Sequence, residues 1–366
     1  MTPIKKIGII TWHYYSNFGS ALQTFASYHT LGRLGFDPIV VNYRNRRLYS
    51  EKLPIASRLK SSIKTILTSV PFAPLKYKNN PEKFRSRYIK ETPLFFDEEP
   101  GRNICKDLDA VLCGSDQIWA PNVYNPFYFA HYLSGKNIRK ISYAASVGLN
   151  DIPDDLVDKY KVHLQDFYAV SVREQEGSDL LKKRCGIDAE VVLDPTLLVS
   201  ADVYKSMQST VKGISGRYLF CYFLNKDHQY RKAVEKYASE HQLQIVGVSD
   251  KPADGEWMLR LTNLGADHFL WLINNAATVM TDSYHGSIFS LLFHKNLWTF
   301  VRFAEDSPIC QNSRIRQLAN NFHINHRIIS ANSVIDDAKI IDFDLFESQL
   351  SHLRDHSFNY LHKALS

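Results

Sequence analysis

Residues 7–43 read IGIITWHYYSNFGSALQTFASYHTLGRLGFDPIVVNY, and this stretch decides the fold. Apolar residues dominate residues 7–12, recur at helical spacing over residues 21–34, and dominate again over residues 38–43. The pattern predicts a strand, a helix that ends at Gly35, and a second strand. Because a helical crossover joins strands that run in the same direction, the chain begins with a parallel β–α–β unit.

The same alternation continues along the chain. In the first half, a helix is predicted at residues 174–183, and strands at 110–113, 141–145, 168–172 and 190–193. A break follows over residues 194–216, where Pro195, Gly213 and Gly216 cluster. Beyond it, strands are predicted at residues 218–223, 244–248, 278–281 and 297–301, and helices at 229–241, 267–276, 287–293 and 344–365. Nearly continuous apolar strands between amphipathic helices indicate an α/β fold with parallel sheets.

These elements predict two Rossmann-like domains that face a cleft. The first spans residues 1–200 and carries an insertion at about 44–90, and the second spans residues 201–340. A C-terminal helix within residues 341–366 is expected to pack back on the first domain. Ligands of open parallel sheets bind beyond the carboxyl ends of the strands, so the turns that follow the strands are where a site is expected.

The composition narrows the class of protein. The 366 residues are 45% hydrophobic and 22% charged, which suits a large core and excludes global disorder. No run of 18 apolar residues is present, and the N-terminal apolar stretch is too short for a secretion signal, so a cytoplasmic protein is expected. The five cysteines show neither CxxC pairing nor zinc-ligand spacing, so we expect no disulfide framework and no metal site.

The positive charge is concentrated in one segment. The whole chain has a net charge of +6, yet residues 44–90 hold 13 basic and two acidic residues, so the rest is net negative. Apolar residues fall at helical spacing over residues 55–70. This predicts either an interfacial helix that meets anionic lipid at the inner face of the membrane, or an amphipathic helix on the core with a solvated basic rim. We favour the second, and no module indicates a nucleic-acid partner.

Three turns between a strand and a helix combine glycine with Ser, Asn or Asp. Their candidate ligand-binding residues are Asn17, Gly19 and Ser20 in the first turn, Ser115 and Asp116 in the second, and Ser283 in the third. Free N–H groups at a helix start favour phosphate or carboxylate. The alternative is that the turns are ordinary capped helix starts. Walker A and GxGxxG motifs are absent, which argues against ATP and NAD sites of those kinds.

Four further side chains are candidates for chemistry. His285 follows a buried strand in the third turn, where an imidazole is able to exchange a proton near neutral pH or to serve only as a structural hydrogen-bonding group. Arg173 ends a strand, where it either binds an anion or pairs with Glu174, Glu176 or a C-terminal carboxylate. Arg302 and Arg314 either face the cleft or are solvated.

Several blocks in a fixed order resemble the polysaccharide pyruvyl transferase family. Together they cover roughly residues 5–320, and they read NFGSALQ at residues 17–23, GSDQIW at 114–119, YAAS at 143–146, SVRE at 171–174, LDPT at 193–196 and TDSYHG at 281–286. The resemblance implies a fold like that of two-domain glycosyltransferases of the B type (GT-B). It also implies transfer of a pyruvyl unit from phosphoenolpyruvate to two sugar hydroxyls, which forms a ketal during surface or exopolysaccharide synthesis.

The resemblance also implies roles for particular residues. His285 is expected to be the general acid or base, and Arg173 the residue that binds the anionic donor. The acceptor is a glycan, often lipid-linked, and no metal or cofactor is required. Some family members carry Arg two residues before this histidine, where this chain has Ser283, so Arg302 or Arg314 replaces that cation or the donor differs. A GT-B glycosyltransferase that uses a nucleotide sugar and a non-catalytic binder of anions or glycans are the alternatives.

Overall fold

β1 (Lys6–Ile10), α1 (Phe18–Arg33) and β2 (Asp37–Val40) form the predicted strand–helix–strand unit. The two strands are parallel, with Ile7 opposite Pro38. The helix begins three residues before the predicted start, because the Asn17 side chain accepts hydrogen bonds from the backbone N–H groups of Gly19 and Ser20, at 2.8 and 3.3 Å.

The computed structural model describes residues 4–14, 17–45, 75–76, 81–225, 229–304, 307, 310–330, 333 and 335–366. Most of the basic segment, including the helix predicted over residues 55–70, lies outside these residues. The described elements form two parallel sheets, which confirms the predicted α/β fold. We call the part with the first sheet the first half and the part with the second sheet the second half. The division at residue 200 stays a prediction.

The first sheet has the strand order β2-β1-β4-β5, in which β4 is Ala110–Cys113 and β5 is Arg139–Ser142. β6 (Ser171–Val172) and β7 (Glu190–Val191) pair separately, and two isolated bridges connect their neighbourhood to β5 and the turn after it. The helices α4 (Pro81–Tyr88), α5 (Glu98–Ile104), α6 (Asp154–Gln165) and α7 (Gln175–Cys185) complete this half.

The second sheet has the strand order β13-β12-β11-β8-β9-β10-β3, and every neighbouring pair is parallel. The strands are β8 (Tyr218–Tyr222), β9 (Gln244–Val248), β10 (Leu259–Thr262), β11 (Thr278–Thr281), β12 (Asn296–Phe300), β13 (Ile328–Ile329) and β3 (Leu75–Lys76). Its helices are α8 (Ala201–Ser206), α9 (Arg231–Glu240), α10 (Ala266–Asn275), α11 (Tyr284–Leu292) and α12 (Ser313–Asn321). β3 belongs to the predicted first-domain insertion, yet it forms the edge of this second sheet.

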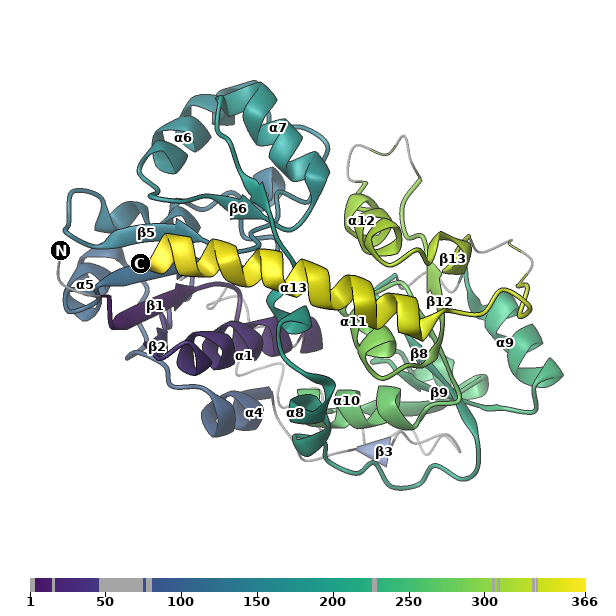
Figure 1. The fold of residues 1–366 in the computed structure, drawn as a ribbon. Helices are drawn as coiled ribbons and strands as arrows, with labels where there is room; N and C mark the ends of the chain where they lie inside the picture. Colours follow the sequence, from purple (N-terminus) through teal and green to yellow (C-terminus); the bar gives the residue numbers. More distant parts are fainter. Residues whose placement is uncertain are drawn as a thin grey trace.

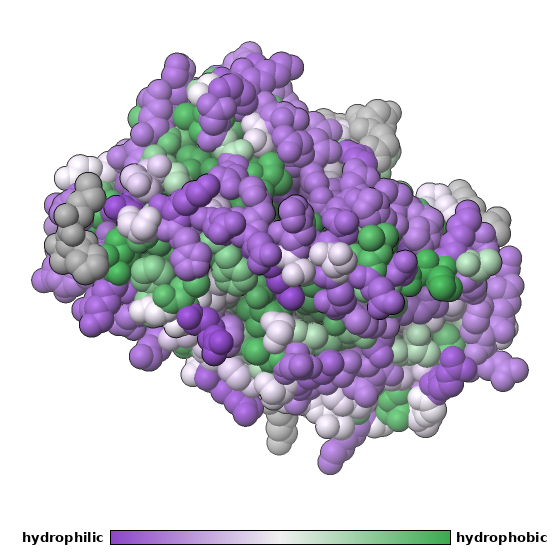
Figure 2. Space-filling view, viewed as in Figure 1, coloured by the Kyte–Doolittle hydropathy of each residue, from purple (hydrophilic) through white to green (hydrophobic). Residues whose placement is uncertain are grey.

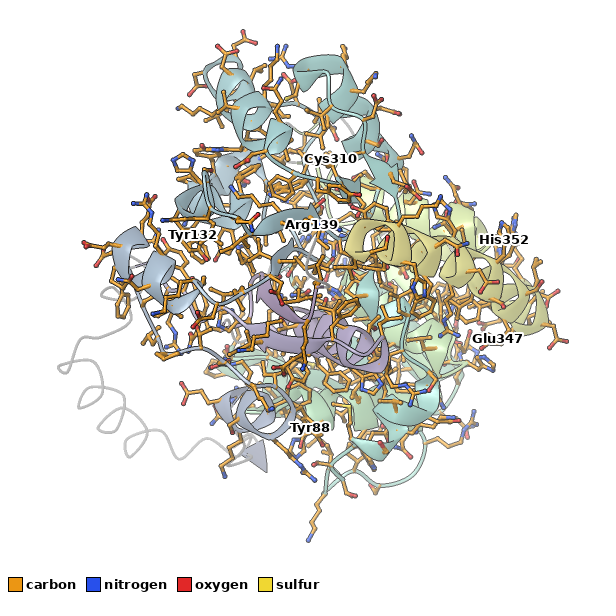
Figure 3. All side chains as sticks on the ribbon, turned by 60° about the vertical axis from the view of Figure 1, so that its left-hand side comes forward. Tyr88, Tyr132, Arg139, Cys310, Glu347 and His352 are labelled. Carbon is orange, nitrogen blue, oxygen red and sulfur yellow. The ribbon has the colours of Figure 1, made fainter. Side chains whose placement is uncertain are left out.

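The last helix, α13 (Phe343–Leu365), crosses both halves (Figure 1). Near its start, Glu347 contacts His294 of the second half at 2.8 Å. Near its end, the Tyr360 hydroxyl donates to the Ser142 carbonyl of β5 at 2.7 Å, and Arg139 donates to the Ala364 carbonyl at 3.2 Å. Figure 3 shows Arg139 beside one end of the helix and Glu347 toward the other.

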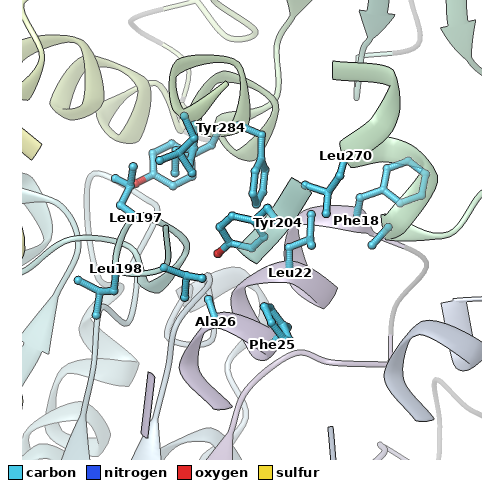
Figure 4. Packing of buried hydrophobic residues seen from close by; sticks show 14 of the residues in the cluster. Phe18, Leu22, Phe25, Ala26, Leu197, Leu198, Tyr204, Leu270 and Tyr284 are labelled. Atoms are coloured by element: carbon cyan, nitrogen blue, oxygen red, sulfur yellow. The ribbon is translucent and has the colours of Figure 1, made fainter. Parts of the chain in front are cut away.

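The two halves share one hydrophobic core. α1 of the first half packs against residues of the second half, and Phe18 stacks on Phe269 with ring centroids 4.8 Å apart. Tyr204 of α8 lies edge-on to Phe289 of α11 at 4.8 Å, and Figure 4 shows it among side chains of α1, α10 and the segment 197–198. Burial of this apolar surface holds the halves in one arrangement.

The face of the molecule crossed by α13 is mostly hydrophilic, and its apolar patches are separate from one another (Figure 2). Among the described residues, no helix has both the length and the apolar composition needed to cross a membrane.

Candidate active site

A cleft of about 1420 Å³ is lined by both halves. Its walls include residues at the first or second position after a strand, such as Trp12 after β1, Ser249 after β9, Asp282 after β11 and Arg302 after β12. The cleft therefore opens at the carboxyl ends of the strands, which is the place that the sequence predicted.

His285 lies in the first turn of α11 and borders this cleft, with 7% of its surface exposed. Ser283 caps the helix: its hydroxyl accepts from the N–H of Gly286 at 3.2 Å, and its own N–H donates to the Thr281 hydroxyl at 3.0 Å. These bonds fix the turn that carries the imidazole.

The imidazole of His285 lies directly against the backbone of Gly19 in α1. A methyl group at Gly19 would fall 2.2 Å from Nδ1 and 2.6 Å from Cγ of His285. Only glycine leaves room for the ring there. Gly19, predicted to be a ligand-binding residue, thus lies against the side chain of His285.

Asp194 lies behind His285 and is almost fully buried. Its Oδ2 lies 3.5 Å from His285 Nε2 and accepts a hydrogen bond from Arg173 Nη1 at 2.9 Å. Its Oδ1 accepts from the N–H and the hydroxyl of Thr196, at 3.0 and 2.7 Å. Burial by itself raises the pKa of Asp194, but His285, Arg173 and the bonds from Thr196 outweigh it and hold the pKa of this carboxyl well below its usual range.

Arg173 is fully buried beneath the cleft and does not line it. Its guanidinium contacts Asp194 at 2.9 Å, Asp116 at 3.5 Å and Glu174 at 3.6 Å. Burial by itself lowers the pKa of Arg173, but the neighbouring carboxylates outweigh it and raise the pKa above its ordinary value. All of these contacts are made within the protein, which favours the salt-bridge alternative with Glu174 over direct anion binding.

Most N–H groups of the three predicted turns already have partners. In the second turn, Ser115 N–H donates to Gln23 Oε1 at 3.2 Å, and Gln117 N–H donates to Asp116 Oδ1 at 2.9 Å. Asn17 and Ser283 occupy N–H groups in the other two turns in the same way. For these groups the structure favours capped helix starts over open anion sites.

Asp116 connects the first two turns. It has a left-handed backbone with φ of 73°, and its Oδ2 accepts from the Ser20 hydroxyl at 2.6 Å. Burial by itself raises the pKa of Asp116, but the charges of Arg173 and His285 and the bond from Ser20 lower it overall.

Arg302 and Arg314 present positive charge to the cleft. In the described part of the chain, neither Nε has a hydrogen-bond partner, and both atoms are buried. Arg314 donates to Gln311 Oε1 at 3.0 Å. Burial and the charges of Arg173 and Arg302 lower the pKa of Arg314 to about 10. Two cations that line the same cleft favour the binding of an anion within it.

The structure brings most of the sequence-predicted site residues to one cleft. The lining residues are Asn17, Ser20, Asp116, Ser283, His285, Arg302 and Arg314, whereas Gly19, Ser115 and Arg173 lie behind the surface. Ser115 donates its hydroxyl to the Ala144 carbonyl at 2.8 Å and lies 3.2 Å from Asp194 Oδ2.

The sequence analysis did not identify Asp194 as the partner of His285. The block LDPT at residues 193–196 was the available signal, because Asp194 lies in it and caps the turn at residues 195–197. Asp282, the nearer acid in sequence, instead binds the N–H groups of Leu224 and Asn225 at 2.6 and 2.8 Å. In the residues that the structure describes, no cluster of His, Cys, Asp and Glu is arranged to hold a metal ion.

Two parallel α/β halves around a cleft define a GT-B-like fold, and several solved structures share it, among them UDP-N-acetylglucosamine 2-epimerases. S. aureus MnaA, in a co-structure with UDP, is 13% identical, with a TM-score of 0.53 over 98% of this chain and 96% of that chain. The UDP-GlcNAc 2-epimerase of Neisseria meningitidis, bound to UDP-GlcNAc, is 10% identical, with a TM-score of 0.51 over 99% and 94%. The Methanocaldococcus jannaschii enzyme is 11% identical, with a TM-score of 0.50 over 94% and 92%.

Sequence comparison gives the family. The family described as polysaccharide pyruvyl transferase matches residues 17–301, which is most of the chain, and the chain belongs to this family. No curated protein sequence matches this chain. Family membership supports a transferase, and the GT-B-like fold agrees with the two-domain architecture predicted from the sequence.

Proposed function

We propose that this protein transfers a pyruvyl unit from phosphoenolpyruvate to two hydroxyls of a glycan sugar and forms a cyclic ketal. The observation that carries the proposal is the position of His285, which lines the same cleft as Arg302 and Arg314 and is backed by the ionised Asp194. A cleft that holds both a proton-transfer group and cations suits a substrate that is doubly anionic and must be protonated on carbon.

Arg302 and Arg314 bind the donor in this scheme. Phosphoenolpyruvate carries a phosphate and a carboxylate, and a guanidinium forms bidentate hydrogen bonds with either group. These arginines supply the positive charge that some family members have as an arginine at the position of Ser283. The Nε atoms without partners and the lowered pKa of Arg314 support an anion at this place, because a bound anion would offset the repulsion between the two side chains.

His285 supplies the proton. Transfer of a proton from the imidazolium to the methylene carbon of phosphoenolpyruvate converts the double bond to a methyl group and leaves an oxocarbenium-like centre at C2. A sugar hydroxyl adds to C2 and returns its proton to the imidazole of His285. Cleavage of the bond from C2 to the phosphate oxygen releases phosphate, and a second hydroxyl attacks C2, loses its proton to the departing phosphate and closes the ketal. In this scheme the Asp194 carboxylate, 3.5 Å from Nε2, orients the ring.

Arg173 acts on this chemistry through Asp194 and Asp116, so we assign it as a positioning residue. Its buried guanidinium fixes both carboxylates and neutralises part of their charge. The scheme uses no metal step, and phosphoenolpyruvate is a substrate rather than a cofactor.

The acceptor is a glycan, and a lipid-linked oligosaccharide suits the size of the cleft. A volume of about 1420 Å³ exceeds the roughly 300–1,000 Å³ of a common small-molecule pocket. The donor alone would leave most of this space unfilled.

One experiment tests the reaction. The protein is incubated with phosphoenolpyruvate and a panel of lipid-linked oligosaccharides, and the products are analysed for phosphate release and for the mass increment of a pyruvyl ketal. We expect His285→Ala to abolish both signals. His352→Ala, which changes an exposed histidine on α13, is the matched control and should keep wild-type turnover. Turnover in His285→Ala would overturn the assignment.

A GT-B glycosyltransferase that uses a nucleotide sugar is the second candidate. The observation in its favour is that the cleft extends over the ends of β9 and β10, where Ser249, Trp257 and Asn263 line it. A thermal-shift panel separates the two functions: phosphoenolpyruvate should stabilise a pyruvyl transferase, whereas UDP or GDP sugars should stabilise a glycosyltransferase.

A further inference from the structure

The two walls of the cleft differ in charge. Among its described lining residues, the first-half wall, from Trp12 to Leu156, holds one charged side chain, Asp116, and no Lys or Arg. Both Asp116 oxygens already accept hydrogen bonds from Ser20 and Gln117. The second-half wall carries four cations, which are Arg231, Lys251, Arg302 and Arg314, and three carboxylates, which are Asp250, Asp254 and Asp282. Among the described lining residues an anion thus finds cations only on the second-half wall, and the first-half wall suits an uncharged ligand.

The first-half wall presents amides beside apolar and aromatic side chains. Asn122 and Val123 are exposed to the cleft, and Val123 keeps 47% of its surface accessible. Tyr124 and Asn125 follow them along the same wall. An exposed valine next to a tyrosine ring gives a surface on which the C–H face of a ligand can pack, and the amides supply donors and acceptors.

This wall is firmly supported from behind. The Tyr124 hydroxyl hydrogen-bonds to His163 Nε2 at 2.8 Å, and its ring stacks on Tyr160 at 5.8 Å. Asn125 Oδ1 accepts from the N–H of Phe127 at 3.0 Å, and its Nδ2 donates to the Tyr43 hydroxyl at 3.3 Å. A surface whose side chains are fixed in this way binds a ligand with a small loss of conformational entropy.

We propose that the surface formed by Asn122, Val123 and Tyr124 is a binding site for an uncharged sugar ring of the acceptor. A neutral sugar offers the two kinds of surface that this wall matches, which are hydroxyl groups and an apolar C–H face. The assignment rests on the proposed function only in naming this sugar as the acceptor. Asp116 and Ser20 lie on the same wall, and the adjoining Gly19 lies against His285, so this wall reaches the reacting group.

Saturation-transfer NMR on the full-length protein tests the site without catalysis. The probes are neutral tetrasaccharides of glucose, galactose, mannose and N-acetylglucosamine. We expect at least one to receive saturation from the wild type and to bind about tenfold more weakly to Val123→Asp and to Asn122→Asp. The matched control is Val162→Asp, because Val162 is an exposed valine of the first half that does not line the cleft. It should bind the same sugar as the wild type does.

The outcomes separate this site from the donor chemistry. Loss of sugar binding in Val123→Asp, with the thermal shift by phosphoenolpyruvate retained, supports both proposals. Sugar binding that depends on Val123 in a protein that phosphoenolpyruvate does not stabilise would overturn the proposed function and leave the sugar site standing. No saturation transfer to any of the four sugars, or equal transfer in Val123→Asp and Val162→Asp, would overturn the sugar site.

Discussion

Replacing Gly19 by alanine should disable the site while leaving the fold intact. The added methyl group would lie 2.2 Å from Nδ1 of His285, whereas an ordinary van der Waals contact begins near 3.4 Å. The imidazole and the methyl group must therefore separate by about 1.2 Å. The backbone of α1 is held by the shared core, so most of this displacement falls on the His285 ring.

The expected magnitude follows from this displacement. A misplacement of about 1 Å in a catalytic group costs on the order of 100-fold in rate. The effect on stability should be small, because alanine improves helix propensity by roughly 0.5–1 kcal/mol and overpacking costs roughly 1–3 kcal/mol. Gly19→Ala should thus lower the rate of phosphate release about 100-fold and the free energy of unfolding by about 1 kcal/mol.

Gly32→Ala is the matched control in the same helix. A methyl group at Gly32 meets no atom within 4 Å, so this variant should gain stability by roughly 0.5–1 kcal/mol and keep full activity. The assay is phosphate release from phosphoenolpyruvate with the glycan acceptor, with urea unfolding measured in parallel. Wild-type turnover in Gly19→Ala, or an equal loss in both variants, would refute the reasoning.

Four further predictions follow from the same contacts. Asp194→Asn should lower the free energy of unfolding by about 3 kcal/mol at pH 7, because it leaves Arg173 without its nearest partner. The pKa of Asp194 is depressed in the folded state, so this difference should shrink as pH falls below about 4, and an unchanged difference at pH 3 in urea unfolding would contradict it. Arg314→Gln should raise the KM for phosphoenolpyruvate at least tenfold. It should also raise the free energy of unfolding by about 1 kcal/mol, because burial and neighbouring cations disfavour the charged side chain and lower the pKa of Arg314 to about 10. A less stable variant with normal KM would exclude a role in binding the donor. Deleting residues 343–366 should lower the melting temperatures of both halves together, and a loss confined to one half, seen by hydrogen exchange, would argue against the bridging role of α13. When anionic vesicles are sedimented at low salt, the protein should stay in the supernatant, since we favour a solvated basic rim for residues 44–90. Sedimentation of the protein together with the vesicles would instead support a membrane contact.

The main elements of both sheets were predictable from the sequence, because their strands are buried apolar runs. The bounds of β4, β9 and β11 agree with the predicted ones, and glycine or a polar residue follows each run. β10 was missed because Arg260 interrupts its apolar pattern, and this arginine turns back to donate to the Ser249 carbonyl at 3.1 Å. α12 was missed because only one face of a largely polar helix is buried.

The site was predictable in its residues but not in their arrangement. His285, Arg173 and Arg302 lie in the segments that follow strands, and that position follows from the pattern of elements. The direction of the Arg173 side chain depends on three carboxylates from different turns, and no local pattern reports such a cluster. The pairing of Asp194 with His285 likewise joins two distant turns across the boundary between the halves, so it required the three-dimensional structure.

The helix α13 also has a consequence for how the protein is made. It follows every other described element in the chain, so it leaves the ribosome after them. Until then β5 lacks the hydrogen bond from Tyr360, and the core shared by the halves lacks Phe346 and Leu361. Completion of the shared core thus waits for α13, and a nascent chain should expose apolar surface, and need protection from aggregation, until this helix has emerged.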